Sequence, residues 1–182
     1  SATVKRPLAD LMRPTSFDFV VGQDRLLGPN TTLSLMISQS SLGSFLLWGP
    51  PGVGKTTIAR LLSTKFEVHF EQLSAIFSGV KELRNIFDSA KIRKKNGKST
   101  LLFVDEIHRF NKSQQDAFLP YIEDGTIVLV GATTENPSFS LNSALLSRCQ
   151  VLVLDRLSVK NLEQILNNIQ TKMNSTLLLS PD

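Results

Sequence analysis

The sequence has few of the residues that build covalent or metal-based centres. Its 182 residues include one cysteine, Cys149, and two histidines. One cysteine excludes an internal disulfide and a zinc site made of several cysteines, and it suits a reducing compartment. His108 has no second ligand at metal-binding spacing, which predicts a packing or supporting role for it. No apolar run is long enough to span a membrane and no signal peptide opens the chain, so we expect no membrane partner.

The chain also carries only a small excess of positive over negative charge. Lys and Arg number 20 against 16 Asp and Glu, a formal net charge of +4. This mildly basic balance is compatible with a nucleic-acid partner but does not by itself predict one. The one biased segment, KIRKKNGK, carries Lys91, Arg93, Lys94, Lys95 and Lys98. These cations can contact phosphates, or they can form a solvated helix end that complements the helix dipole.

The alternation of short apolar runs with helical periodicity predicts the fold class. At 41% hydrophobic content the chain can bury one core, which indicates one domain with an appendage. Apolar strands alternating with amphipathic helices are typical of a parallel sheet covered by helices, and we therefore predict an α/β fold. The predicted strands are Phe45–Trp48, Val68–Phe70, Thr100–Asp105, Thr126–Gly131 and Val151–Leu154.

Helix starts can be predicted from capping patterns. Apolar residues recur at helical spacing over 80–90, after a candidate cap at Ser78. Ser113 and Asp116 fit a capping box that opens another helix, which Pro120 must bend or shorten.

The stretch LLWGPPGVGKTTIARLL, residues 46–62, has the order strand, loop, helix. Gly49, Gly54, Lys55 and Thr56 fill the pattern GxxxxGK followed by Ser or Thr, in which the backbone N–H groups of a glycine-rich loop point at anionic oxygens. Lys55 would reach the β and γ phosphates, and the Thr56 hydroxyl would contact Mg²⁺. The alternative is an ordinary Gly/Pro turn between two core elements. The pattern predicts a nucleoside triphosphate site.

The run TLLFVDEIHRF is an apolar strand that ends in two acids, Asp105 and Glu106. In open α/β sheets, ligands bind at the carboxyl ends of the strands. Asp105 can hold Mg²⁺ through a water, and Glu106 can polarise the water that attacks the γ phosphate. Alone, acids at the end of a buried strand are ordinary. Together with the loop at 49–56 they predict hydrolysis of a nucleoside triphosphate.

Another apolar strand, in VLVGATTENPSF, ends in Thr133, Thr134, Glu135 and Asn136. A hydroxyl or amide at this strand tip could contact the γ phosphate or the attacking water. The alternative is a polar turn closed by Pro137.

In ALLSRCQ, Arg148 follows a short helix and precedes the final strand. A lone arginine is usually a solvated surface charge. An arginine can also stabilise the charge of a transferred phosphoryl group in a neighbouring subunit's site.

Together, GPPGVGKT, LLFVDE, GATTEN and SRC resemble an AAA+ ATPase of the clamp-loader-related branch, which has a P-loop NTPase fold with a parallel five-stranded sheet. The run DEIHRFNKSQQDAFLPYIEDGTIVLVGATTENPSFSLNSALLSRC is similar, almost residue for residue, to the family of replication-associated recombination protein A and the Werner-helicase-interacting ATPase. RPLADLMRPTSFDFVVGQDRLLGP resembles that family's N-terminal segment. The resemblance runs from about Arg6 to Gln170, and HRFNKSQQD and TTENPSF are its most specific parts.

This resemblance implies ATP as the nucleotide, Mg²⁺ as the metal ion and a role for each matching residue. Lys55, Glu106, Thr134 and Arg148 would be catalytic, with Thr134 as the γ-phosphate sensor ahead of Asn136. Arg148 would insert into the next subunit, which implies a homo-oligomer. The metal would be held by Thr56 and Asp105. The loop residues implied to bind nucleotide are Gly49, Pro50, Pro51, Gly52, Val53, Gly54, Lys55, Thr56 and Thr57, and those near the adenine are Leu8, Arg13, Val21 and Gly22.

The resemblance also implies a division of the chain. Residues 1–156 would form the AAA+ core, with an adenine-side segment at 6–28, and 157–182 would begin a helical lid. A helix predicted from Ser158 to about Gln170 belongs to this lid. Family members continue beyond it, so we expect the chain to be a fragment whose nucleotide affinity and assembly are impaired.

The function implied is a DNA-dependent ATPase that acts at stalled or gapped replication forks, loading onto or remodelling DNA ends. Arg109 and Lys112 are its candidate DNA contacts, because the helix after them faces the central passage in clamp-loader-like assemblies. A branch-migration motor at Holliday junctions is one alternative. A nucleotide-gated scaffold that recruits replication proteins, such as single-strand-binding protein, is another. The resemblance favours a bacterial cytoplasm, or a nucleus in a eukaryote.

Overall fold

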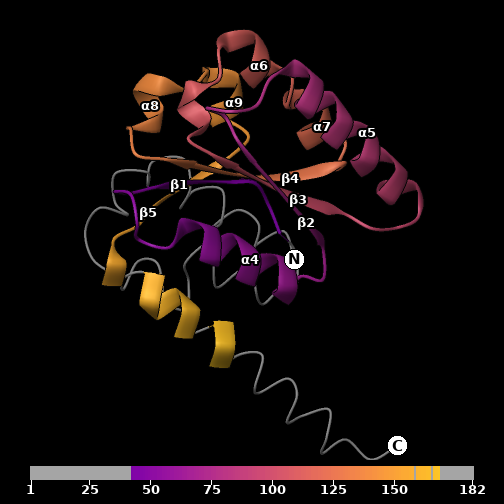
Figure 1. Cartoon of the computed structure of the whole chain (residues 1–182). Helices are drawn as coiled ribbons and strands as arrows, with labels where there is room; N and C mark the ends of the chain where they lie inside the picture. The colour runs from indigo at the N-terminus through magenta and orange to yellow at the C-terminus, as the bar shows by residue number, and fades with distance from the viewer. Residues whose placement is uncertain (1–41, 158, 165, 169–182) are drawn as a thin grey trace, which may run out of the picture.

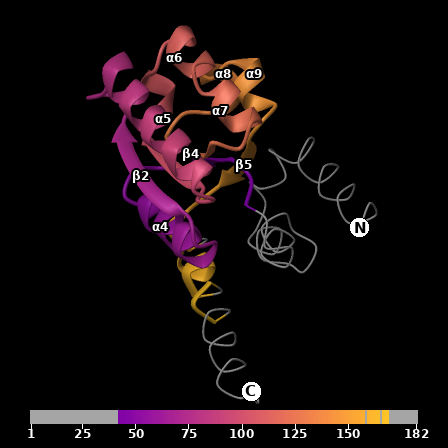
Figure 2. The same ribbon diagram turned by 90° about the vertical axis from the view of Figure 1, so that its right-hand side faces the viewer.

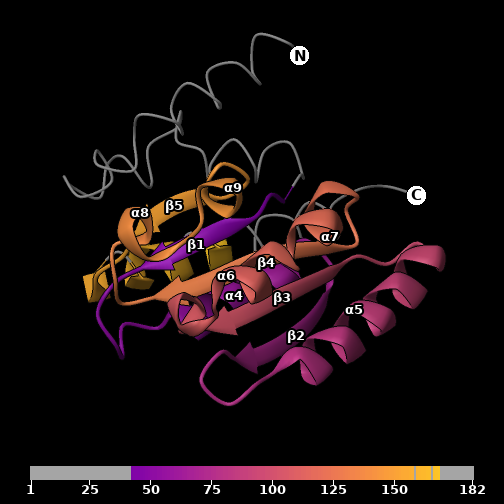
Figure 3. The ribbon, with the colours of Figure 1, turned by 90° about the horizontal axis from the view of Figure 1, so that it is seen from above.

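A computed structural model describes residues 42–157, 159–164 and 166–168 of the chain. Within these residues, five strands form one sheet in the order β2-β3-β4-β1-β5. Every neighbouring pair is parallel, and the arrows in Figure 3 accordingly point to the same edge. The predicted α/β fold with a five-stranded parallel sheet is confirmed. The strands are β1 (Phe45–Trp48), β2 (His69–Ser74), β3 (Thr100–Asp105), β4 (Ile127–Thr133) and β5 (Gln150–Val153).

Helices cover both faces of the sheet. Figures 1 and 2 show α4 on one face and α5 to α9 on the other. Residues 156–157, 159–164 and 166–168 are helical too and lie on the α4 side. No helix in the described residues is long and apolar enough to cross a membrane. The remaining elements are α4 (Lys55–Lys65), α5 (Val80–Lys95), the 3-10 helix η2 (Ile107–Arg109), α6 (Lys112–Asp116), α7 (Leu119–Glu123), α8 (Pro137–Ser140) and α9 (Ser143–Leu146).

The core consists of two apolar layers, one on each face of the sheet. Successive side chains of a strand point to opposite faces. Phe45 and Phe103 therefore pack in the layer under α4, while Leu46 and Leu102 pack in the layer under α5. All four side chains are fully buried. Burial on both faces explains why the central strands β1, β3 and β4 read as nearly unbroken apolar runs, whereas the edge strand β2 carries polar residues.

Two strands end later than predicted, and their true ends determine where polar residues lie at the edge of the sheet. β1 and β3 have the predicted limits. β4 extends two residues further than predicted, to Thr133, because it pairs with β1 as far as Trp48. β2 is longer as well, because it pairs with β3 as far as Asp105. Asp105 and Thr133 therefore end neighbouring strands at the same edge.

The predicted cap of α5 at Ser78 is wrong by one residue. Gly79 is the N-cap, and its N–H donates to the Glu82 carboxylate at 2.8 Å. A carboxylate in the first turn complements the helix dipole, so Glu82 satisfies the helix start without a hydroxyl cap.

The predicted capping box of Ser113 and Asp116 is also wrong. Asn111 is the N-cap of α6; its side chain accepts the Gln114 N–H at 2.8 Å, and the Gln114 side chain accepts the Asn111 N–H at 2.9 Å. An asparagine with a glutamine three residues later satisfies both donors. Pro120 shortens the segment as expected: the chain forms two short helices, with Pro120 in the first turn of α7, where it loses no hydrogen bond.

Truncation of the central core aromatic tests this two-layer packing. We expect Phe103→Ala to lower the free energy of unfolding by about 3–5 kcal/mol, because a fully buried phenylalanine leaves a cavity. Phe139→Ala is the matched control. Phe139 is 89% exposed, and its loss should change stability by no more than about 0.5 kcal/mol. Urea unfolding measures both, and equal effects would contradict the assignment of the core.

Candidate nucleotide site

The loop between β1 and α4 depends on glycine at specific positions. Gly52 and Gly54 have φ values of 76° and 106°, a backbone region that other residues rarely adopt. Gly54 is the N-cap of α4. A Cβ on Gly49 would lie 2.3 Å from the Leu154 carbonyl oxygen. The glycines of the sequence pattern therefore shape a loop whose following helix presents free N–H groups at its N-terminus, the arrangement that binds phosphate.

The Lys55 ammonium joins this loop to the tip of β4. Lys55 is only 8% exposed. Its Nζ donates to the Gly49 carbonyl at 2.6 Å and approaches the Thr133 carbonyl at 3.4 Å. Burial lowers the pKa of Lys55, and the charges of Glu106 and Asp105 oppose that shift. The ammonium thus lies within the field of both carboxylates that the sequence singled out.

The two acids follow β3 in different conformations. Asp105 is the last residue of the strand and is half-buried. Glu106 has a left-handed backbone, with φ 54° and ψ 45°, and turns the chain into η2. This conformation costs a non-glycine residue on the order of 1–3 kcal/mol, and it persists only where the surroundings hold it. The Glu106 carboxylate lies 3.2 Å from His108 Nε2.

Thr56 and Asp105 were predicted to hold Mg²⁺. Both are half-buried, and their hydroxyl and carboxylate oxygens are ligands that this ion accepts. Asp105 ends β3, whose neighbour β4 ends at Thr133 beside Trp48 of β1, so its carboxylate lies at the same edge of the sheet as the loop that follows β1. The described residues contain no cluster of three or more His, Cys, Asp or Glu side chains that could hold a metal alone. This fits Mg²⁺, which is usually bound by one or two protein groups together with phosphates and waters.

His108 and Thr133 complete a polar network that sequence reasoning did not assemble. The His108 side chain is 4% exposed, and its Nδ1 lies 2.9 Å from Thr133 Oγ1. The Glu135 N–H donates to the same hydroxyl at 3.0 Å. The sequence predicted a supporting or packing role for His108. The missing information was the pairing of β3 with β4, which no local pattern encodes.

Thr134, the preferred γ-phosphate sensor, is exposed just beyond the end of β4. Asn136 caps α8 by accepting the Ser138 N–H at 3.0 Å. Thr133, by contrast, is fully buried. Thr134 as the sensor stays a prediction.

Comparison with known proteins identifies the family of this arrangement. The family described as "ATPase family associated with various cellular activities (AAA)" matches residues 45–157, more than half of the chain. The chain belongs to the AAA family. The matched range begins at β1 and continues past β5 into the helical residues from 156 onward, so it includes every element that builds the loop and the strand ends.

Curated relatives carry replication and recombination names. The chain is 52% identical to "Replication-associated recombination protein A" of Haemophilus influenzae over 160 residues, 88% of this chain and 36% of the relative. Against the protein of that name from Escherichia coli it is 53% identical, with the same coverage. It is 48% identical to "ATPase WRNIP1" of Dictyostelium discoideum, covering 88% of this chain and 18% of the relative. The chain spans about a third of the length of the bacterial relatives.

A solved structure with the same fold is the "RuvB Holliday junction branch migration motor" of Thermotoga maritima. The TM-score is 0.53 at 27% identity, with 85% of this chain and 45% of the other covered. A point variant of the same RuvB gives a TM-score of 0.57 at 30% identity, with 79% of this chain and 48% of the other covered.

Arg148 of this AAA domain lies at the opposite edge of the sheet from the loop. It precedes β5, which pairs in parallel with β1 from Phe45↔Gln150 onward, whereas the loop follows β1. The four-residue strand between the two edges is about 13 Å long. The Arg148 Nε donates to the Glu123 carboxylate at 2.7 Å, and its Nη1 donates to the Ala144 carbonyl at 2.9 Å. Next to it, burial raises the pKa of the Cys149 thiol to about 12.

The basic residues divide into two groups. Arg109 and Lys112 are exposed and follow the edge that carries Glu106, as a DNA contact would require. In the run 91–98, Arg93 pairs with Glu71 at 3.0 Å, and Lys94 donates to the Asp124 carbonyl. These contacts within the AAA domain favour the structural alternative for that run. Leu8, Arg13, Val21 and Gly22 lie outside the described residues.

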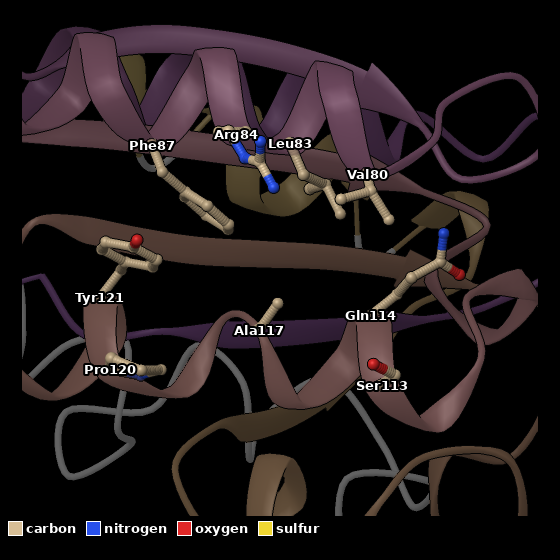
Figure 4. A pocket seen from close by; sticks show the side chains of 9 residues that line it. All are labelled: Val80, Leu83, Arg84, Phe87, Ser113, Gln114, Ala117, Pro120 and Tyr121. Carbon is tan, nitrogen blue, oxygen red and sulfur yellow. The ribbon is translucent and has the colours of Figure 1, made fainter.

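A groove of about 340 Å³ lies away from the loop, between α5 and α6–α7 (Figure 4). Phe87 of α5 stacks on Tyr121 of α7, with ring centroids 4.1 Å apart. Leu83 and Ala117 face each other further along, and the exposed Arg84 projects beside them. The groove shares no residue with the nucleotide loop.

Substitution of Gly49 tests the loop geometry. Because the added methyl would collide with the Leu154 backbone, we expect Gly49→Ala to weaken ATP binding at least roughly tenfold, about 1.4 kcal/mol, and to lower the unfolding temperature. Gly97→Ala is the control: its φ is 78°, and no atom lies within 4 Å of the added methyl. It should cost about 1 kcal/mol of stability and leave ATP binding unchanged. Equal ATP affinities in both variants, measured by titration calorimetry, would contradict the assignment.

Proposed function

We propose that the protein is a DNA-dependent ATPase that acts in replication-fork maintenance, recombination and repair, and that it uses ATP to load onto or remodel DNA ends and gaps. The observation that carries the proposal is the position of the Lys55 ammonium. It bridges the Gly49 carbonyl and the tip of β4 beside the carboxylates of Asp105 and Glu106. A buried cation at the start of a helix, facing two acids, is an arrangement that binds and cleaves a phosphoanhydride.

In this site each residue has a separate task. Lys55 would leave its carbonyl partners for the phosphate oxygens of ATP, which satisfy an ammonium better than carbonyls do. Glu106 would orient a water and accept its proton as the water oxygen attacks the γ phosphorus. The bond from that phosphorus to the bridging oxygen breaks, and ADP and inorganic phosphate leave. Thr56 and Asp105 would hold Mg²⁺, which when bound offsets the negative charge of the phosphates.

Arg148 supports an oligomeric form of this mechanism. Because Arg148 lies at the amino edge of the sheet and the loop at the carboxyl edge, it cannot contact the site of its own domain. In an oligomer, Arg148 of one copy would leave Glu123 and contact the phosphates of the nucleotide bound to the neighbouring copy. Such arginines contribute about 10³–10⁵ in rate in other phosphoryl-transfer systems. Thr134, exposed beyond β4, would sense the γ phosphate.

The DNA component of the proposal rests on two features. Arg109 and Lys112 are exposed directly after the Glu106–His108 turn, so phosphate contacts there would act close to the water-activating carboxylate. The relatives at about half identity bear the name "Replication-associated recombination protein A". Because the chain spans 36% of those relatives, their whole activity, a homo-oligomeric state, contacts with single-strand-binding protein and a cytoplasmic or nucleoid location all belong to this proposal.

A branch-migration motor is a second candidate, supported by the RuvB structures at 27–30% identity. Sequence similarity to the recombination proteins is higher, at 52–53%, which favours the first proposal. Strand displacement on a synthetic four-way junction would favour the motor. ATP-dependent retention on DNA without unwinding would favour a nucleotide-gated scaffold.

ATP hydrolysis by the full-length protein tests the proposal. We expect gapped or end-bearing DNA to stimulate turnover, and Glu106→Gln and Arg148→Ala each to lower kcat by about 10²-fold or more, since one removes the proton acceptor and the other the trans-acting charge. Arg84→Ala, at an exposed arginine remote from the loop, should keep wild-type turnover.

Mixing the two defective variants tests whether the site is shared. Glu106→Gln subunits still supply Arg148, and Arg148→Ala subunits still supply Glu106. A mixture should therefore regain part of the DNA-stimulated activity. A mixture as inactive as either variant alone, or an Arg148→Ala variant as active as wild type, would show that Arg148 does not act between subunits.

A further inference from the structure

We propose that the groove between α5 and α6–α7 is a docking site for an acidic, amphipathic segment of a partner protein. Apolar side chains of that segment would enter the groove, and its carboxylates would meet the cations of α5. The groove has a volume of about 340 Å³. This docking surface is separate from the nucleotide chemistry, because the groove shares no residue with the loop between β1 and α4.

The floor of the groove is apolar and recessed. Leu83 and Phe87 of α5 are 2% and 4% exposed, and Ala117, the C-cap of α6, faces Leu83 across the gap (Figure 4). Because the alanine side chain is short, the facing helices leave room there for an apolar side chain of another molecule. Val80, which is 60% exposed, adds an apolar rim at the start of α5. Recessed apolar surface of this kind receives the anchor side chains that contribute most to binding in protein interfaces.

The groove has the length of a short helical contact. Its lining on α5 runs from Val80 to Phe87, and a rise of about 1.5 Å per residue makes that distance about 10 Å. A helical peptide that binds in a groove uses anchors at positions i, i+3 or i+4, and i+7, which span the same distance along its axis. The groove therefore fits about two turns of an amphipathic segment.

The charge around the groove is positive. Six Lys and Arg residues of α5 stand against Glu82 and Asp88, an excess of four that equals the net charge of the whole chain. Arg84 belongs to the lining itself. At the Tyr121 end, the Lys91 Nζ lies 5.1 Å from the centroid of the Tyr121 ring. Within the part of the chain that the structure describes, none of the lining residues is acidic.

The acids nearest the groove do not neutralise this charge. Glu82, Asp116 and Glu123 each accept a hydrogen bond from another residue of the chain. Asp88, the remaining acid of α5, is exposed and does not line the groove. Arg84 has no hydrogen bond or ion pair among the described residues. Its guanidinium is therefore available to a carboxylate, which it can bind through two parallel hydrogen bonds.

The occupant is a peptide rather than a nucleic-acid strand, because the aromatic rings of the groove already stack on each other. Bases bind single-strand sites by stacking on exposed aromatic side chains, whereas the Phe87 and Tyr121 ring centroids are 4.1 Å apart and their planes differ by 20°. A sugar–phosphate backbone would also leave the apolar floor uncovered. An acidic segment with apolar side chains matches both the floor and Arg84.

Peptide selection on the full-length protein tests this proposal. In a library of random peptides of about twelve residues, roughly three helical turns, we expect enrichment of acidic sequences with apolar residues three or four positions apart. A fluorescein-labelled copy of the most enriched peptide then gives a Kd by anisotropy. A second copy with Asn and Gln in place of Asp and Glu should bind at least about tenfold more weakly, because it loses the charge pairing with α5.

Arg84→Glu and Val80→Asp test the groove from the protein side. Both residues are exposed, and an acid in the first turn of α5 complements the helix dipole, so we expect both variants to fold. Each should weaken binding of the labelled peptide at least about tenfold. Arg156→Glu and Ile92→Asp are the matched controls. They make the same types of change at exposed positions outside the groove and should leave the Kd unchanged.

Circular dichroism of each variant separates lost binding from lost structure. A selection that enriches no peptide, or that enriches basic ones, would overturn the proposal. So would equal Kd values in the groove variants and their controls. Unlabelled single-stranded DNA serves as the competitor. If it displaces the peptide, and Arg84→Glu weakens DNA binding by the same factor as peptide binding, the groove is a nucleic-acid site and the proposed peptide is wrong.

Discussion

The buried Lys55 ammonium is the constraint on which the site depends. A cation that is 8% exposed must be compensated by nearby acceptors, and here they come from three segments. The Gly49 carbonyl belongs to the loop, the Thr133 carbonyl to β4, and the carboxylates to the end of β3 and the residue after it. Only a parallel sheet with β1, β4 and β3 side by side brings these segments together. Surrounding this one ammonium with acceptors therefore depends on the strand order, on the left-handed glycines of the loop and on the lengths of the strands.

The same parallel sheet separates the candidate nucleotide loop from Arg148. The loop, Asp105, Glu106 and the His108 network lie at the carboxyl edge, while Arg148 and its partner Glu123 lie at the amino edge. A single AAA domain thus carries the candidate nucleotide loop at one edge and Arg148 at the other. Under the proposed mechanism, two copies would be needed to bring the loop of one and the arginine of the other together.

Sequence reasoning predicted those features that depend on residues close together in the chain. The limits of β1 and β3, the phosphate loop and the acids all follow from unbroken apolar runs and a glycine pattern. It was wrong at the caps of α5 and α6, because Gly79 with Glu82 and Asn111 with Gln114 satisfy the helix starts in place of the predicted hydroxyls. It could not place His108 against Thr133, since residues 25 apart meet only through the β3–β4 pairing.

The most direct measurement is the ATP affinity and stability of Lys55→Met in the full-length protein, with the exposed Lys81→Met as control. If Lys55 is buried to bind phosphate, methionine should weaken ATP binding at least about tenfold, beyond any loss of stability that follows from leaving the Gly49 carbonyl without its donor. If ATP binding were retained and only stability changed, Lys55 would be a structural cation, and the account of a nucleotide site at this edge would be contradicted.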